Sequence, residues 1–151
     1  MPLDQAAAKT ELRKFMDPKF FDYQGDAVSK QDSIEKAINA WKRALQKSCE
    51  SISPSSTTLS SATEAFATAA EGMHLDPSGA IFQAACASFA TQLGNGMVGY
   101  TAIPPLAPFI PIGGDTSNAE LSCDFKATQL VQWLKNGKAT NIASGVVVSW
   151  S

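Results

Sequence analysis

Residues 34–52 read IEKAINAWKRALQKSCESI, and apolar side chains recur in them every three or four positions. Because an α-helix completes a turn in about 3.6 residues, this spacing predicts an amphipathic helix with one buried stripe. Asp32 or Ser33 is placed to cap the start of this helix, and Pro54 with the serines and threonines after it ends it. The stripe consists of Ile34, Ile38, Trp41, Leu45, Cys49 and Ile52.

Two Ala-rich helices are expected within residues 61–93. The first opens at Ser61, which has the capping-box spacing to Glu64, and the second opens at Asp76 with a proline after it. An Ala-rich helix with almost no charge is poorly solvated in water unless neighbouring elements cover most of its circumference. These two helices therefore indicate a crowded environment.

One further helix is expected at each end of this series. Asp4 can cap an N-terminal helix that runs to about Met16, so that amphipathic helices occupy residues 4–52. Ser117 and Glu120 have capping-box spacing and open a C-terminal helix over residues 117–136. The length fits a single domain, residues 1–151, that needs no disulfide or metal to fold.

Charged residues are concentrated in the first third of the chain. Residues 1–50 contain 17 of the 26 Asp, Glu, Lys and Arg side chains, which leaves nine for the remaining 101 residues. Protein surfaces that face water usually carry about 25–35% charged residues. The charge-poor part is therefore expected either to be unusually buried or to contact other protein molecules, which points to a subunit of an assembly.

Residues 94–116 interrupt the helical pattern with an apolar stretch rich in glycine and proline. Its prolines, Pro104, Pro105, Pro108 and Pro111, exclude a regular helix or a central strand, so the sequence predicts a long loop. Linkers that face solvent are polar, so an apolar loop must pack on its own domain or on a neighbour. Proline fixes much of the backbone in advance, which lowers the conformational entropy lost on docking.

The last segment, residues 138–151, is predicted to form a β tail, because Val146 to Trp150 has the composition of a strand. A lone strand leaves its backbone groups unpaired. It must therefore pair either with another segment of this chain, around Thr140 to Ala143, or with the edge of a neighbouring molecule. Trp150 is expected either to fold back on the domain or to insert into a partner.

Residues with catalytic or metal-binding chemistry form no recognisable constellation. His74 is the single histidine, and the acids near it in sequence fit helix ends rather than a catalytic pair. The three cysteines lack the close paired spacing of a metal site and are expected to be reduced, buried thiols: Cys49, Cys86 and Cys123. We therefore expect no enzyme, no catalytic residue, no metal site, no cofactor and no small-molecule substrate.

Nucleic acid and membrane are not expected partners either. The net charge of −2 is too small to steer the protein toward nucleic acid. The N-terminus lacks the basic start and apolar core of a signal peptide, and no apolar run approaches the ~18 residues of a membrane span. Synthesis in the cytoplasm is the expectation.

The last 75 residues combine an Ala-rich helix, the segment GMVGYTAIPPLAP at residues 96–108, a capped helix ending in WLKNGKATN, and SGVVVSW at residues 144–150. This order of features resembles small virion structural proteins of tailed bacteriophages, particularly contractile-tailed ones. The resemblance covers about half of the chain. It implies a component of the tail, baseplate, neck or capsid, made in the host cytoplasm and located in the virion, with other virion structural proteins as partners.

The sequence thus predicts a mainly α fold with four to five helices, a long apolar Pro-rich loop and a short C-terminal strand or hairpin. The function expected is that of a non-enzymatic structural subunit that assembles with other copies of itself and with virion neighbours. Truncation after Gly145 is expected to leave a helical domain that fails to assemble. The residues expected at the interface are Met97, Tyr100, Ile103, Leu106, Phe109, Ile110, Ile112, Val146, Val148 and Trp150.

A small helical binding module remains the alternative interpretation. Such a module would hold an apolar ligand or a partner helix in a pocket between the Ala-rich helices and the proline loop.

Overall fold

The computed structural model describes residues 3–16, 30–111 and 119–151. Five helices and three short strands account for most of these residues, which confirms the mainly α fold class. In chain order the elements are α1 (Gln5–Met16), α2 (Lys30–Cys49), α3 (Leu59–Ala69), the 3-10 helix η1 (Met73–Leu75), α4 (Ala80–Asn95), β1 (Tyr100–Ile103), α5 (Ala119–Leu134), β2 (Lys138–Asn141) and β3 (Val147–Ser149).

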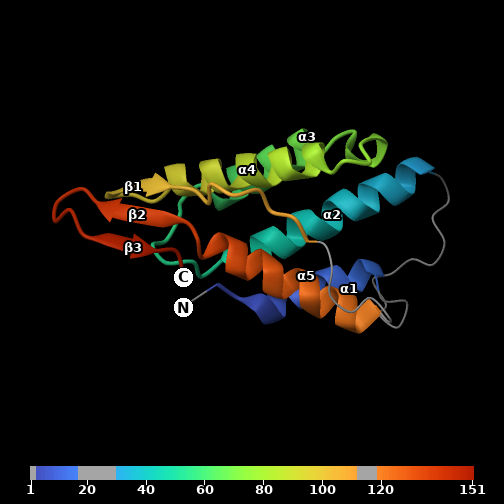
Figure 1. The fold of residues 1–151 in the computed structure, drawn as a ribbon, viewed down its shortest axis with the longest axis horizontal. Coiled ribbons are helices and arrows are strands. Elements are labelled where there is room, and N and C mark those ends of the chain that lie inside the picture. Colours follow the sequence, from blue (N-terminus) through green and yellow to red (C-terminus); the bar gives the residue numbers. More distant parts are fainter. Residues whose placement is uncertain (1–2, 17–29, 112–118) are drawn as a thin grey trace.

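The helices form one body, and the strands form a small sheet at one end of it (Figure 1). Helix α3 packs mainly on α4, whereas α1 packs on α2 and α5. Helix α2 also contacts α3 and thereby joins the two groups of helices. The sheet is attached to this body through β1, which lies against α4.

The described side chains of the α2 stripe are buried or partly buried as their spacing predicts, and the side chain of Ile34 lies outside the described part. Trp41, Leu45, Cys49 and the following Ile52 belong to the hydrophobic core, and Ile38 packs partly buried against it. The predicted cap of α1 is also present, because Asp4 Oδ1 accepts a hydrogen bond of 2.9 Å from the backbone N–H of Ala7. The predicted cap of α2 is wrong, because the helix begins at Lys30, before Asp32 and Ser33. Periodicity therefore describes α2 correctly, whereas capping chemistry describes only the start of α1.

The predicted start of α3 is wrong. The helix begins at Leu59 after Thr58, so Ser61 and Glu64 lie inside it and form no capping box. Glu64 instead pairs with Lys42 Nζ of α2. The Thr58 hydroxyl donates a hydrogen bond of 2.5 Å to the carbonyl of Gln92, which fixes the start of α3 against the end of α4. A hydrogen bond between Thr58 and α4 is thus present in place of the predicted capping box between Ser61 and Glu64.

Helix α4 also begins later than predicted, at Ala80, although Asp76 still serves its N-terminus. Asp76 Oδ2 accepts a hydrogen bond of 2.8 Å from the N–H of Ile81, and Oδ1 accepts one from the hydroxyl of Ser78. These bonds to Ser78 and Ile81 lower the pKa of the Asp76 carboxyl, because they favour its charged form. The later start requires Gly79, whose φ of 78° is left-handed. The second predicted capping residue, Ser117, lies outside the described residues.

The three strands form an antiparallel sheet in the order β1-β2-β3. The β tail therefore pairs with its own chain, through β2, which includes the Thr140 position expected from the sequence. Strand β1 lies inside the stretch predicted to be a loop, and this is a correction. Its four residues end immediately before Pro104, so the prolines do not interrupt its hydrogen bonds.

Trp150 folds back on its own domain and is completely buried. Its backbone N–H donates to the carbonyl of Gly137 (2.9 Å), and its indole Nε1 donates to the carbonyl of Lys138 (3.1 Å). The indole lies so close to Gly137 that a Cβ there would be 2.2 Å from Cδ2. Ser151 and Ser53 then exchange two backbone hydrogen bonds of 2.8 and 3.0 Å, which attach the chain end to the loop after α2.

Candidate interaction surface

The proline segment, residues 104–111 after β1, is attached to the helices by aromatic side chains. Phe109 is buried, with its ring centroid 5.9 Å from that of Trp41 on α2 and 5.5 Å from that of Trp133 on α5. It also lies 5.9 Å from Phe82 of α4. Trp133 Nε1 donates a hydrogen bond of 2.7 Å to the carbonyl of Ala107. The segment is therefore held as a fixed element of the surface.

Three residues assigned to an interface from the sequence belong to the core of this chain instead. Met97, Phe109 and Trp150 are each at most 2% exposed, so they have no surface to offer a partner, and their assignment is corrected. Their burial also changes the meaning of truncation after Gly145. That truncation removes the Trp150 indole from the core together with β3, so it tests stability as well as assembly.

Five of the assigned residues do expose apolar surface. Leu106 is 89% exposed on the proline segment, and the others are Ile103, Ile110, Val146 and Val148. Tyr100 is partly buried against the core, and Ile112 lies outside the described residues.

The sequence interpretation missed three exposed apolar residues on or beside the sheet: Val98 (77% exposed), Ile142 (70% exposed) and Val147. Strand alternation favours every second residue of β3, but all three of its residues are exposed. The signal that was available is the valine run itself, since adjacent apolar residues cannot all face one side of a strand.

The register of the sheet explains which side chains share its open side. Residues directly opposite each other point to the same face of an antiparallel sheet. Ala102, Ala139 and Val148 are opposite one another on the inner face, where Ala139 is fully buried. The other face, here called the outer sheet face, carries Thr101, Ile103, Lys138, Thr140, Val147 and Ser149.

Apolar side chains also gather at the hairpin end of the sheet. The N–H of Ile142 donates to the carbonyl of Gly99 (3.0 Å), which brings Ile142 near the Val98 turn. The N–H of Asn141 donates to the carbonyl of Val146 (2.9 Å), and its side-chain Oδ1 accepts from the N–H of Ala143 and that of Ser144. These bonds hold the turn in one shape. Residues 139–151 contain no Asp, Glu, Lys or Arg.

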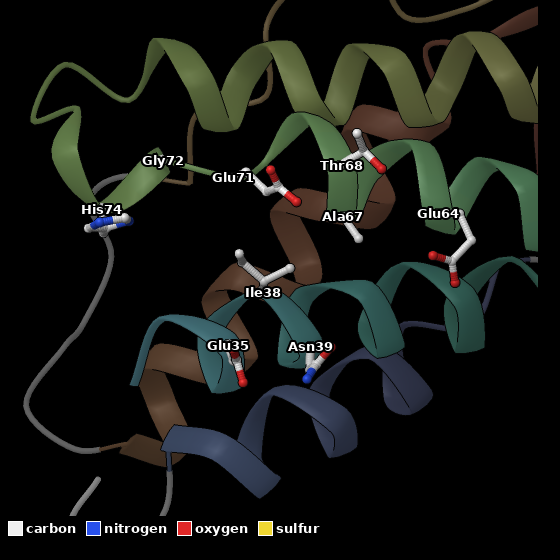
Figure 2. Close-up of a pocket in the computed structure, with 9 residues that line it drawn as sticks. All are labelled: Glu35, Ile38, Asn39, Glu64, Ala67, Thr68, Glu71, Gly72 and His74. Atoms are coloured by element: carbon white, nitrogen blue, oxygen red, sulfur yellow. The ribbon is translucent and has the colours of Figure 1, made fainter. Parts of the chain in front are cut away.

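A cleft of about 710 Å³ lies between α2 and α3. Figure 2 shows Ile38 on α2 pointing toward α3, with Glu35 and Asn39 beside it on α2, Glu64 on α3, and Glu71 and His74 at the far end of the cleft. His74 is exposed, and Glu64 is paired with Lys42. Within the described part of the chain, no group of three or more His, Cys, Asp or Glu residues is arranged to hold a metal ion.

A smaller hollow of about 410 Å³ lies between the proline segment and α5, beside Trp133 and Gln132. The sequence placed a ligand pocket instead between the proline loop and the Ala-rich helices. On that side, the rings of Phe82 and Phe109 meet.

The cysteines lie inside the protein. Burial raises the pKa of Cys49 to about 12, with a smaller opposing effect of the Ser48 hydroxyl, and burial also raises the pKa of Cys86. Cys123 is buried as well. The protonated thiols of Cys49 and Cys86 are poor nucleophiles, and all three buried cysteines pack as small core residues.

Comparison of the chain with protein-family models, curated proteins and solved structures finds no match. In the described part of the chain, no helix has both the length and the apolar character needed to cross a bilayer.

Proposed function

We propose that this protein is a non-enzymatic structural subunit of a bacteriophage virion. In this proposal it assembles with other copies of itself and with neighbouring virion proteins through the sheet end of the molecule. The sheet end comprises β1, β2 and β3 with their turns, and the proline segment that follows β1. The virion assignment rests on the resemblance of the C-terminal half to small phage structural proteins. The docking role rests on the geometry of the surface.

The observation that carries the docking role is exposed apolar surface on a fixed framework. Leu106 lies on a segment that Phe109 and Trp133 hold in place, and Val147 lies on a strand whose end Trp150 anchors in the core. Several large apolar side chains are thus exposed on ordered elements, and exposed apolar surface of this kind is typical of protein–protein contacts. Because the framework is already ordered, little conformational entropy is lost on binding.

The scarcity of charged residues also favours a docking role for this surface. Lys138 is the single charged residue of the outer sheet face, and no charge follows it in the chain. Interface centres are depleted of charge, because a charge buried without a partner is costly. The sheet end therefore has the composition of an interface centre.

Association can be tested with single substitutions of exposed residues. Leu106→Lys is expected to abolish concentration-dependent association in sedimentation velocity, because it places a charge in the contact. The matched control is Leu75→Lys, where the leucine is 70% exposed. It belongs to η1, in the segment between α3 and α4 at the end of the helices away from the sheet (Figure 1). Both variants should keep the circular dichroism of the unmodified protein. A monomer at every soluble concentration, or equal effects of the two substitutions, would contradict docking through this surface.

The virion assignment has its own test. Mass spectrometry of purified particles of the phage that carries the gene should detect this chain in a constant ratio to the major tail or capsid protein. Presence of the chain in infected cells but not in the particles would overturn the assignment.

A further inference from the structure

We infer that β3 pairs antiparallel with β3 of a second copy of this chain, about a two-fold axis that passes beside Val148. This inference rests on the proposed function and names the partner of one part of the same surface. Strand β3 leaves backbone N–H and C=O groups on its outer edge, and these groups carry the inference.

The hydrogen bonds of the hairpin determine which residues of β3 face outward. Val146 accepts from the N–H of Asn141, and Trp150 donates to the carbonyl of Gly137, so these two residues face β2. In an antiparallel pair, successive residues alternate between facing the partner strand and facing away. Val147 and Ser149 therefore direct their N–H and C=O groups away from β2. In the described part of the chain, β3 is an edge strand of the sheet.

Beyond β3, the same side of the chain already pairs with another backbone segment at Ser151. Ser151 has the same alternation as Val147 and Ser149, and it exchanges two backbone hydrogen bonds with Ser53. This contact shows that the outward backbone groups on this side of the chain can pair with another backbone segment. The residues of β3 itself are all exposed. The Ser151 contact also closes the edge beyond Ser149. At the other end, Gly145 turns the chain with a φ of 73°. The free edge thus consists of β3 alone, Val147–Ser149.

A second copy of the same edge fits this short segment. With Val148 opposite Val148 of the copy, Val147 lies opposite Ser149 in both directions, and all outward N–H and C=O groups of the segment are paired. A register centred on Val147 places Ser149 opposite Gly145 of the copy, where the chain turns away. Only the register centred on Val148 therefore satisfies both outward residues, and its symmetry is that of an isologous dimer.

The chemistry of the segment also favours a second copy as the occupant. Like charges placed opposite each other destabilise a strand pair, and no Asp, Glu, Lys or Arg lies between Ala139 and Ser151 to cause such repulsion. The other edge of the sheet is less suited. Strand β1 lies against α4, where a Cβ on Gly94 would be 2.9 Å from Cβ of Ala102, and two prolines follow it.

The pairing joins two sheets into one of six strands. The outer sheet face then continues across the axis, and Val147 and Val148 lose exposed surface. An exposed edge strand that is not covered by other elements can pair in this way with a strand of another molecule. The contact itself is small, so it acts where many copies are held together, as in a particle.

Disulfide trapping tests this register. In the non-hydrogen-bonded pair at the axis the two Cα atoms lie about 4.5 Å apart, within the range of a disulfide. Val148→Cys is therefore expected to give a reducible covalent dimer under mild oxidation. Val146→Cys is the matched control, because the two residues at that position are about 13 Å apart in this register. The native cysteines are all buried and give no background.

A second variant covers the case in which Val148→Cys disturbs the fold. Val147→Pro removes an outward N–H and no N–H of the β2–β3 ladder, and proline is tolerated on edge strands, so we expect the hairpin to be kept and association to fall. Association that persists without cross-linking of Val148→Cys would overturn the β3 pairing and leave the assembly role standing. Equal cross-linking of the two cysteine variants would also overturn it. Absence of association in the unmodified protein would contradict both proposals.

Discussion

The α1–α5 side and the sheet end of this molecule expose different kinds of side chain to water. At the α1–α5 side, Lys9 Nζ lies 2.8 Å from Asp124 Oδ1, and Arg13 Nη1 lies 3.6 Å from Glu120 Oε1. At the sheet end, valine, isoleucine and leucine side chains are exposed with Lys138 as the one charge of the outer sheet face. The first surface favours solvent, and the second favours another protein.

The difference also concerns what holds each region together. Helix α1 joins α2 and α5 through a hydrophobic core with ion pairs around it, whereas the sheet end depends on a few buried side chains and backbone bonds. Trp150 contributes both, since its indole fills the space beside Gly137 and its two N–H groups satisfy backbone carbonyls. The comparison therefore makes predictions about where substitutions matter for stability and where they matter for association.

The largest expected effect is that of Trp150→Ala. Removal of a completely buried indole should lower the free energy of unfolding by about 3–5 kcal/mol, because the lost contacts leave a cavity. Urea denaturation followed by circular dichroism measures this change. Val98→Ala, at an exposed site of the same end, should change stability by less than about 0.5 kcal/mol. A Trp150 variant as stable as the unmodified protein would show that the indole does not anchor the sheet.

Gly137→Ala tests the same anchor from the opposite side. An added methyl group would lie 2.2 Å from the indole Cδ2, so the tryptophan or the β2 backbone must move. We expect a loss of about 1–3 kcal/mol in the free energy of unfolding, as for other overpacked cores. Asn136→Ala, at the exposed neighbour, serves as the control. Similar unfolding midpoints for these two variants would argue against the close contact.

In the charged region, the buried acid should matter more than the exposed one. Glu11 is 6% exposed, accepts a hydrogen bond from Lys14 Nζ (3.1 Å) and lies 3.4 Å from Arg43 Nε. Glu11→Gln should cost about 1–2 kcal/mol in the free energy of unfolding. Glu120→Gln, at an exposed carboxylate paired with Lys9 and Arg13, should cost less than about 1 kcal/mol. The reverse order in denaturant melts would contradict the assigned burial.

The smallest effect is expected at Asp76, which belongs to neither region. Its folded-state pKa is lowered, so the carboxylate contributes stability above its unfolded pKa, and this contribution is lost as the pH falls through the lowered value. Asp76→Asn should therefore reduce the melting temperature slightly near pH 7 and flatten its fall between the usual aspartate pKa and lower pH. Parallel melting profiles of the two proteins from neutral to acidic pH would count against this role.

Local patterns predicted the parts of the fold that local chemistry controls. The apolar repeat of α2 and the Asp4 cap of α1 follow from helix geometry, and the structure confirms both. The capping box at Ser61 failed because Thr58 gains a hydrogen bond to Gln92 of α4, a contact that sequence spacing does not contain. The Ala-rich helices pack on each other as their small side chains allow, yet Ala84 and Ala87 remain exposed on α4.

The candidate surface was predicted only in part for the same reason. Leu106 and Val146 are exposed, so their interface role stays a prediction, whereas Met97 and Phe109 are core residues. An apolar side chain has the same composition whether its own domain or a neighbour covers it. The choice depends on which ring or helix lies opposite, and that is a property of the folded chain.

The sequence by itself determined that this protein is mainly helical, that its charges lie near the N-terminus, and that its last residues form a strand. These features follow from periodicity, composition and backbone preference, which act over a few residues. Only the tertiary structure decided that Trp150 closes the core, that residues 100–103 join the sheet as β1, and that the valines of β3 remain at an open edge. Those outcomes depend on contacts between residues distant in the chain, whose energies no local pattern encodes.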